Sequence, residues 1–190
     1  MYNIKKDMRF FYIIIFLLLI IVVKAENNVP PKVITQQFDN WSFKCVENKD
    51  NKDCEVSQSI RIQNTNINFS IIYSKFLNPN NEIKKQITII SPHGVDLRSE
   101  LLLTFDQDES IKLNWASCES FGCLVFLTDN TKDIQALNDF KKILSKIINN
   151  KKLFATFKGY ANQQPFNIEF NLAGFKESSS QLDKININNQ

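Results

Sequence analysis

The sequence contains a single histidine, His93, and only four glycines in 190 residues. One histidine excludes a metal site built from several histidines. Four glycines are too few for a glycine-rich loop that cradles a phosphate group. His93 lies in "SPHGVDL", where Pro92 and Gly94 predict a turn, so we expect an exposed turn residue and not a general base. We therefore expect no enzyme activity, no cofactor and no metal.

An excess of charge is also absent from most of the chain. Of the 23 basic and 20 acidic residues, four basic residues and one acidic residue precede Glu26. The remainder of the chain therefore carries equal numbers of both signs, and these are interspersed. Such a surface gives no electrostatic reason to expect binding to nucleic acid or to an anionic membrane.

The N-terminal region has the three parts of a signal peptide. Lys5, Lys6 and Arg9 form a basic start, residues 10–23 form an apolar run, and Ala25 ends the segment. The run is shorter than the roughly 20 residues of a membrane-spanning helix. We therefore predict a signal peptide over residues 1–25 and a periplasmic or secreted protein. The alternative is an uncleaved anchor, which would be the only contact of this protein with a membrane.

Four cysteines follow the leader, namely Cys45, Cys54, Cys118 and Cys123. In an exported chain, an even number of cysteines is expected to form disulfides. Four cysteines allow three pairings. We favour Cys45 with Cys54 and Cys118 with Cys123, because each pair encloses a short polar segment that suits a turn between strands. Neither spacing suits a zinc site, and the Cys-x-x-Cys motif of redox proteins is absent.

Signals for short strands dominate the rest of the chain. In "FNIEFNL", residues 166–172, apolar and polar side chains alternate, which is the period of a half-buried strand. Seven or more such segments predict a mainly β domain over residues 38–176, an antiparallel β-sandwich or barrel. One amphipathic helix is predicted over about 131–149, capped by Asn130 or Thr131.

Both flanks of this domain are polar and offer little apolar surface to offset the entropy of an ordered chain. We therefore expect residues 26–37 to be a flexible segment and residues 177–190 to be a disordered tail. The interior contains one unusual polar position. If "CEVSQSIRI" is a strand, Gln58 points to the same face as Val56 and Ile60. We expect its buried amide to bond to backbone groups of the "SPHGV" or "CESFGC" turn.

Several of these residues form an ordered pattern. Trp41 precedes Cys45 by four residues, Gln58 follows Cys54 by four, and "SPHGVDL", "CESFGC" and "FNLAGF" come next in that order. The set resembles the invasion-associated locus B family of alphaproteobacterial exported proteins, from about Trp41 to Phe175. The resemblance implies a small β-rich domain outside the cytoplasm, without established catalytic residues. It marks six positions as structural, namely Trp41, Gln58, Gly94, Gly122, Gly174 and Phe175.

We therefore predict an exported, non-catalytic binding or adhesion module that recognises a protein or an envelope component through its loops. The resemblance implies a role in host-cell interaction or invasion. The alternative is a periplasmic factor that maintains or assembles the envelope. A third hypothesis is a hydrolase whose acidic residues converge only in the folded chain. The sequence leaves the identity of the partner and the oligomeric state open.

We expect the mature protein to begin near Glu26, because the preceding residues have the basic, apolar and small-residue parts of a cleaved leader. Mass spectrometry of the protein isolated from its native cell should show that residues 1–25 have been removed. An intact N-terminus on a domain that faces the cytoplasm would contradict this expectation.

Overall fold

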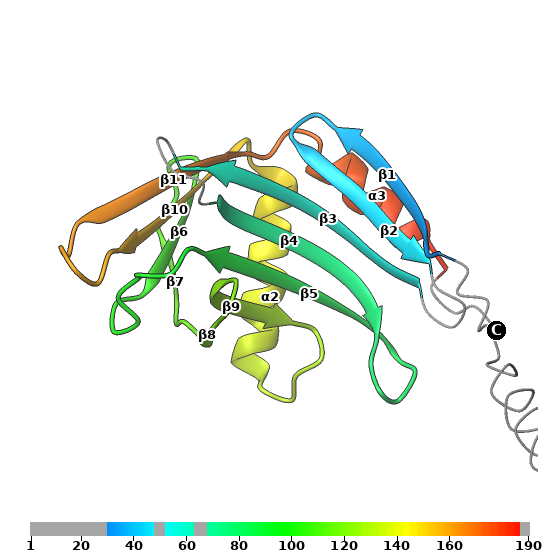
Figure 1. The fold of residues 1–190 in the computed structure, drawn as a ribbon, viewed down its shortest axis with the longest axis horizontal. Coiled ribbons are helices and arrows are strands. Elements are labelled where there is room, and N and C mark those ends of the chain that lie inside the picture. Colours follow the sequence, from blue (N-terminus) through cyan, green and yellow to red (C-terminus); the bar gives the residue numbers. More distant parts are fainter. Residues whose placement is uncertain (1–29, 48–51, 63–67, 187–190) are drawn as a thin grey trace, which may run out of the picture. The chain divides into compact units, whose positions relative to one another are not determined.

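The structure is a computed structural model and describes residues 30–47, 52–62 and 68–186. The predicted signal peptide lies outside these residues. The larger of two antiparallel sheets has the strand order β1-β2-β3-β4-β5-β9-β8, and the smaller has the order β11-β10-β6-β7 (Figure 1). The larger sheet contains β1 (Lys32–Phe38), β2 (Trp41–Glu47), β3 (Lys52–Arg61), β4 (Asn68–Leu77), β5 (Ile83–Ser91), β8 (Ser117–Glu119) and β9 (Gly122–Thr128).

The smaller sheet contains β6 (Leu101–Phe105), β7 (Ile111–Leu113), β10 (Lys152–Lys158) and β11 (Pro165–Asn171). Two helices, α2 (Ile134–Asn149) and α3 (Phe175–Lys184), lie on one side of the larger sheet (Figure 1). Within the described residues neither sheet closes into a barrel. The prediction of a mainly β, antiparallel fold is confirmed, and of its two forms the sandwich-like one is present.

Strand β4 illustrates how the sequence directs one face of the sheet to the interior. Phe69, Ile71 and Tyr73 are buried, and the residues between them are half-buried. Successive side chains of a strand point to opposite faces, so this alternation places every second residue in the core. The ring of Phe69 stacks on that of Phe157 in β10, with centroids 5.4 Å apart. This aromatic pair joins the two sheets.

Both predicted disulfides are present. Cys45 lies directly opposite Cys54 across β2 and β3, and Cys118 lies opposite Cys123 across β8 and β9. Each disulfide therefore joins two neighbouring strands of one hairpin. A bond of this kind stabilises mainly by restricting the unfolded chain, with a small loop giving roughly 2 to 3 kcal/mol on the chain-entropy model.

Helix α2 begins later than the sequence indicates. Its N-cap is Asp133, whose Oδ1 accepts the backbone N–H groups of Gln135 and Ala136. The predicted caps, Asn130 and Thr131, are therefore wrong. The Asp133 carboxylate lies two residues before the free N–H of Gln135 and can accept its hydrogen bond. Thr131 lies too far from the first turn of the helix to do so. The buried face of α2 consists of Phe140, Ile143 and Ile147.

The structure corrects the prediction at both flanks. Residues Lys32–Phe38, predicted to be mostly flexible, form β1 and pair with β2 along its whole length. Residues Phe175–Lys184, predicted to be mostly a disordered tail, form α3. The signal for this second helix is weak because two of its buried residues, Ser178 and Ser179, are polar. Small serines let the helix approach the sheet closely, and the Ser178 hydroxyl donates to the Phe175 carbonyl at 3.0 Å.

A buried lysine fixes the far end of α3. Lys75 is 7% exposed, and its Nζ donates to the carbonyls of Asp183 at 3.1 Å and Ile185 at 2.7 Å. Carbonyl groups at a helix C-terminus lack helical partners and favour a nearby cation. Burial lowers the pKa of Lys75, and the neighbouring Asp183 opposes that shift. The last turn of α3 is thus attached to the middle of the larger sheet.

The carbonyl of Asn171, at the end of β11, joins the two sheets. It accepts hydrogen bonds from Trp41 Nε1 at 3.2 Å and from Gln58 Nε2 at 3.1 Å. Gln58 is 5% exposed and also donates to the Asn40 carbonyl at 3.2 Å. The amide therefore points inward and binds backbone groups, as predicted. The predicted partners are wrong, because the Asn40 turn and the end of β11 lie beside Gln58.

The chain turns from this carbonyl into α3 through Gly174 and Phe175. Gly174 has a φ of 88°, and a Cβ at this position would lie 2.1 Å from the carbonyl oxygen of Phe38. Only glycine fits such a close approach. The next ring, Phe175, meets Trp41 edge-on with centroids 4.7 Å apart. Four of the six residues predicted to be structural, Trp41, Gln58, Gly174 and Phe175, thus lie together.

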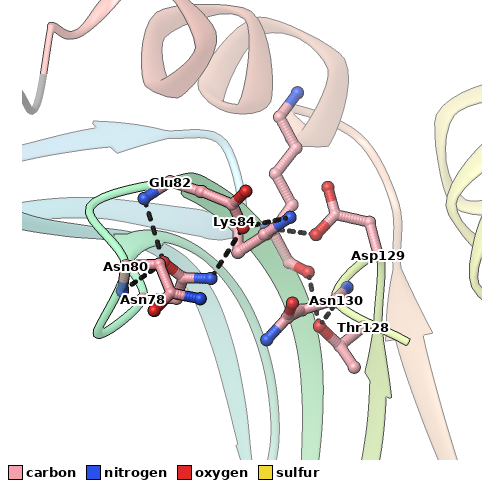
Figure 2. Close-up of polar contacts among 8 residues, drawn as sticks. Asn78, Asn80, Glu82, Lys84, Thr128, Asp129 and Asn130 are labelled. Atoms are coloured by element: carbon pink, nitrogen blue, oxygen red, sulfur yellow. Dashed lines mark hydrogen bonds and ion pairs between the residues drawn. The ribbon is translucent and has the colours of Figure 1, made fainter. Parts of the chain in front are cut away.

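A separate polar network closes the β4–β5 hairpin (Figure 2). The side chain of Asn78 is buried, and its Oδ1 accepts the backbone N–H groups of Asn80 and Glu82, each at 2.9 Å. Its Nδ2 donates to the Glu82 carboxylate at 3.0 Å, and that carboxylate also pairs with Lys84 at 3.2 Å. The turn is therefore held by its own side chains.

The same network reaches β9 and α3. Asp129 Oδ1 accepts the backbone N–H of Lys85 at 2.8 Å, and the Thr128 hydroxyl donates to the Lys85 carbonyl at 3.2 Å (Figure 2). The Nζ of Lys85 forms an ion pair with Asp183 at 2.6 Å. The charged and amide side chains at this end of the larger sheet thus bond to one another and to backbone groups. We therefore assign them a structural role.

We expect Gly174→Ala to destabilise the protein more than Gly94→Ala. Both glycines have similar positive φ values, 88° and 91°, but a Cβ at Gly94 meets nothing within 4 Å. The Gly94 variant isolates the cost of the backbone conformation, about 1 to 2 kcal/mol. The Gly174 variant adds an overpacking cost of about 1 to 3 kcal/mol. Urea denaturation measures both, and equal losses would contradict the close approach to Phe38.

Candidate functional site

Three loops that are bonded to one another carry the exposed apolar side chains of Leu97, Phe121 and Tyr160. We call the surface that they form the loop-end surface and define it by His93, Leu97, Arg98, Phe121 and Tyr160. These residues come from three connections, which are the loop after β5, the β8–β9 turn and the β10–β11 turn. Backbone groups join the loop after β5 to the β10–β11 turn, and the His93 side chain joins it to the β8–β9 turn. The loops are therefore one structural unit, even though the sequence separates them widely.

The β8–β9 turn presents Phe121 between the two cysteines of the second disulfide. The next residue, Gly122, has a φ of 146°, and a Cβ there would lie 2.2 Å from the Ser91 carbonyl oxygen. The hairpin can pack against the end of β5 only because this position is glycine. His93 Nε2 donates to the Glu119 carbonyl at 2.7 Å. The histidine is exposed, as predicted, and fastens its loop to the hairpin.

The loop after β5 is also bonded to the β10–β11 turn. The Asp96 N–H donates to the Lys158 carbonyl at 2.8 Å, and the Tyr160 N–H donates to the Gly94 carbonyl at 2.7 Å. Val95 and Gly159 form a β-bridge between these two bonds. The motif "SPHGVDL" is therefore a short bonded segment that extends the smaller sheet, and not only a turn.

The buried carboxylate of Asp96 stabilises the contact between the loop after β5 and the β10–β11 turn. Asp96 is 5% exposed and accepts hydrogen bonds from Arg98 Nε at 2.9 Å and Nη2 at 3.0 Å. Gln163 Nε2 donates to the same carboxylate at 2.9 Å. The hydrogen bonds from Arg98, and then that from Gln163, hold the pKa of Asp96 well below its usual range. The carboxylate is thus ionised at neutral pH and joins the two loops.

Three apolar side chains of the loop-end surface are strongly exposed. Phe121 is 64% exposed, Tyr160 is 62% and Leu97 is 51%. The guanidinium of Arg98 lies over the Tyr160 ring at 5.6 Å from its centroid. The arrangement presents apolar area beside one cation, on loops that are already ordered. Such a surface suits recognition of another macromolecule.

Two aspartates outside the loop-end surface bond to neighbouring parts of the fold. Asp106 accepts the backbone N–H groups of Lys151 and Lys152, and Asp108 pairs with Lys146. Across the described ranges, no three His, Cys, Asp or Glu side chains are grouped in a way that could hold a metal ion. A depression of about 270 Å³ between β2, β3 and β4 is lined by charges of both signs. It lies apart from the loop-end surface and contains no histidine.

The sequence-predicted site residues divide into two groups in the structure. Gly94 and Gly122 belong to the loops that carry the exposed side chains, and the other four predicted structural residues lie at the Asn171 carbonyl. The exposed residues Leu97, Arg98, Phe121 and Tyr160 were not singled out from the sequence. Large apolar residues inside polar turns, as in "ESFGC" and "KGYANQ", are the signal that could have found them.

The family model described as "Invasion associated locus B (IalB) protein" matches residues 41–183. The chain is similar to a solved structure described as "Crystal structure of invasion associated protein b from bartonella henselae". The two are 20% identical, the TM-score is 0.57, and the match covers 79% of this chain and 96% of that chain. At this identity the likeness concerns the fold. No curated protein matches the chain.

The matched residues include both disulfides, the Asn171 carbonyl with its donors, and the whole loop-end surface. In the described part of the chain, no helix has both the length and the apolar character needed to cross a bilayer.

Replacing Asp96 with Asn should lower the free energy of unfolding most strongly near neutral pH. The pKa of Asp96 is lower in the folded protein than in an unfolded chain, where it is about 3.9. Its stabilising contribution is therefore complete above about pH 5, well above the unfolded pKa, and is lost as the pH falls toward the folded pKa. Urea denaturation of both proteins should show a gap that narrows below about pH 5. A gap independent of pH would show that the charge of Asp96 does not stabilise the fold.

Proposed function

The chain belongs to the Invasion associated locus B (IalB) family, and on that basis we propose that it is an exported, non-catalytic binding module. The loop-end surface contacts its partner, which is a protein outside the cytoplasm. The two disulfides support this location, because disulfides form and persist in oxidising compartments. The similar Bartonella henselae structure is that of an invasion associated protein, which favours a host-cell protein as the partner.

The observation that carries the proposal is the exposure of Phe121, Tyr160 and Leu97 on interlocked loops. Apolar side chains of this size cost free energy in water and gain it when a partner covers them. Tyrosine and arginine are also enriched among the residues that dominate the energy of protein interfaces. The loop-end surface contains such a pair, with Arg98 over the ring of Tyr160.

The rigidity of the loops supports the same function. Association costs free energy when a flexible segment becomes ordered, and that cost is small for a loop that is already held. The disulfide between Cys118 and Cys123 holds one loop, and the Asp96 carboxylate holds the other two together. The loops therefore present their side chains in one arrangement before the partner arrives.

The chemistry of the loops favours binding over catalysis. The single histidine donates Nε2–H to a backbone carbonyl, and the buried Asp96 is occupied by Arg98 and Gln163. A general base must reach the proton that it removes, and these two groups are committed to holding the loops.

Photo-crosslinking tests the surface and identifies the partner. A photoreactive phenylalanine at position 121 should capture a protein in the native setting, during contact with host cells. The matched control is position 126, also a phenylalanine of the β8–β9 hairpin, which is 43% exposed on the outer face of β9. Capture of a host protein from position 121 alone supports the proposal. Capture of an envelope protein would favour the assembly-factor alternative, and equal capture from both positions would contradict the surface.

Substitution provides a quantitative test once the partner is known. Tyr160→Ala and Phe121→Ser should each weaken binding by about tenfold or more, because truncating a central interface residue costs more than about 1 kcal/mol. The unfolding free energy should change by less than about 0.5 kcal/mol, since both side chains are exposed. Phe126→Ser serves as the control in a calorimetric or surface-based binding assay. Unchanged affinity in the first two variants would overturn the assignment.

A further inference from the structure

Strand β1 forms one edge of the larger sheet. Among the described residues it pairs with β2 on one side, and no strand pairs with its other side. The pairing with β2 runs without a bulge from Lys32 to Phe38. An edge strand presents a row of backbone N–H and C=O groups that can pair with another chain. The length and the side chains of β1 decide how readily this happens.

The three other edges carry features that discourage pairing. Strands β7 and β8 have only three residues each. Strand β11 begins with Pro165 and carries Glu169, which is paired with Lys152 at 2.7 Å. Short strands, prolines and charges are common means of protecting an edge. Strand β1 has seven residues, no proline and a single charge, Lys32, at its first position. Its Val33 is 52% exposed.

The backbone groups that face the free edge follow from the first disulfide. The Cα atoms of Cys45 and Cys54 are 4.1 Å apart, the close spacing of an antiparallel pair that is not hydrogen-bonded. The backbone groups of Cys45 therefore point away from β3 and toward Ile34, its partner on β1. Because alternate residues point to opposite sides, Val33, Thr35 and Gln37 direct their N–H and C=O groups to the free edge.

We propose that two copies of this chain associate by antiparallel pairing of their β1 strands, with the two-fold axis at Thr35. In this register Thr35 faces Thr35 of the second copy, and Val33 and Gln37 face each other on either side. The three outward-facing residues of each copy can then form about six hydrogen bonds. The two sheets become one continuous sheet across the axis.

The position of the charge favours a second copy in this orientation. Antiparallel pairing places the two Lys32 side chains at opposite ends of the interface, about 20 Å apart at 3.4 Å per residue. That separation exceeds the screening length of about 8 Å at physiological salt. Parallel pairing would set the two lysines side by side. The interface is otherwise uncharged from Val33 to Phe38, so no like charges face each other across it.

Charged side chains introduced at Thr35, on the proposed two-fold axis, test the proposal. The experiment uses the mature protein purified from cells. Sedimentation velocity should show the wild-type mass doubling as the concentration rises, and Thr35→Val, which keeps a β-branched side chain, should behave in the same way. Thr35→Glu and Thr35→Lys each place two like charges face to face and should weaken association at least tenfold. An equimolar mixture of these two variants should dimerise again, because opposite charges then meet at the axis.

Circular dichroism and thermal melting establish that each variant folds. The side chain of Thr35 is exposed beside Lys44 of the same chain, so substitution leaves the core intact. A wild-type protein that stays monomeric at all concentrations overturns the proposal. This holds even if β1 is found to pair with a different polypeptide. Dimers of unchanged affinity in both charged variants place the contact elsewhere. A mixture that fails to restore the dimer rules out pairing about Thr35.

Discussion

The two hydrogen bonds to the Asn171 carbonyl are the constraint on which the fold depends. The buried side chains of Trp41 and Gln58 need an acceptor, since leaving a buried donor unpaired costs about 1 to 3 kcal/mol. The donors come from Trp41 and Gln58 in β2 and β3, so the smaller sheet is anchored to the larger one at this point. The chain then passes Gly174, which is too close to Phe38 for any side chain. The position of α3 follows, with Phe175 against Trp41 and Lys75 at its last turn.

The residues that stabilise the fold and the residues exposed for binding occupy different parts of the structure. The residues that carried the family resemblance are largely architectural, because they are either buried at the Asn171 carbonyl or allow close approach in the loops. The exposed side chains of Leu97, Phe121 and Tyr160 stand on this framework and make none of the hydrogen bonds that hold the loops together. A shared framework with changeable loops is how one fold serves different partners.

The sequence predicts those parts of the structure that depend on local patterns. Alternation identifies the strands, and the short spacing of the cysteines identifies the pairings that the hairpins contain. Prediction from the sequence fails where the buried residues are polar or where an element is only partly buried. Helix α3 buries two serines, β1 has no fully buried residue, and Gln58 meets a carbonyl at a sequence separation of 113. The loop-end surface was missed for a similar reason, because it is assembled from three turns that lie far apart in the sequence, and the bonds that join them follow no sequence periodicity.

The contrast between the disulfides and the Asn171 contacts has a consequence for the order of folding. The disulfides join residues only 9 and 5 positions apart, whereas Trp41 and Asn171 are separated by 130. A chain that emerges with its N-terminus first can thus complete both hairpins and their covalent bonds early. The N–H groups of Trp41 and Gln58 stay hydrogen-bonded to water until the end of β11 has been synthesised and has packed against them. We therefore expect the long-range closure that aligns the two sheets to come late in folding, because contacts of such separation form slowly. Before that closure, the hairpins with their disulfides would leave the aromatic face of the larger sheet open to solvent.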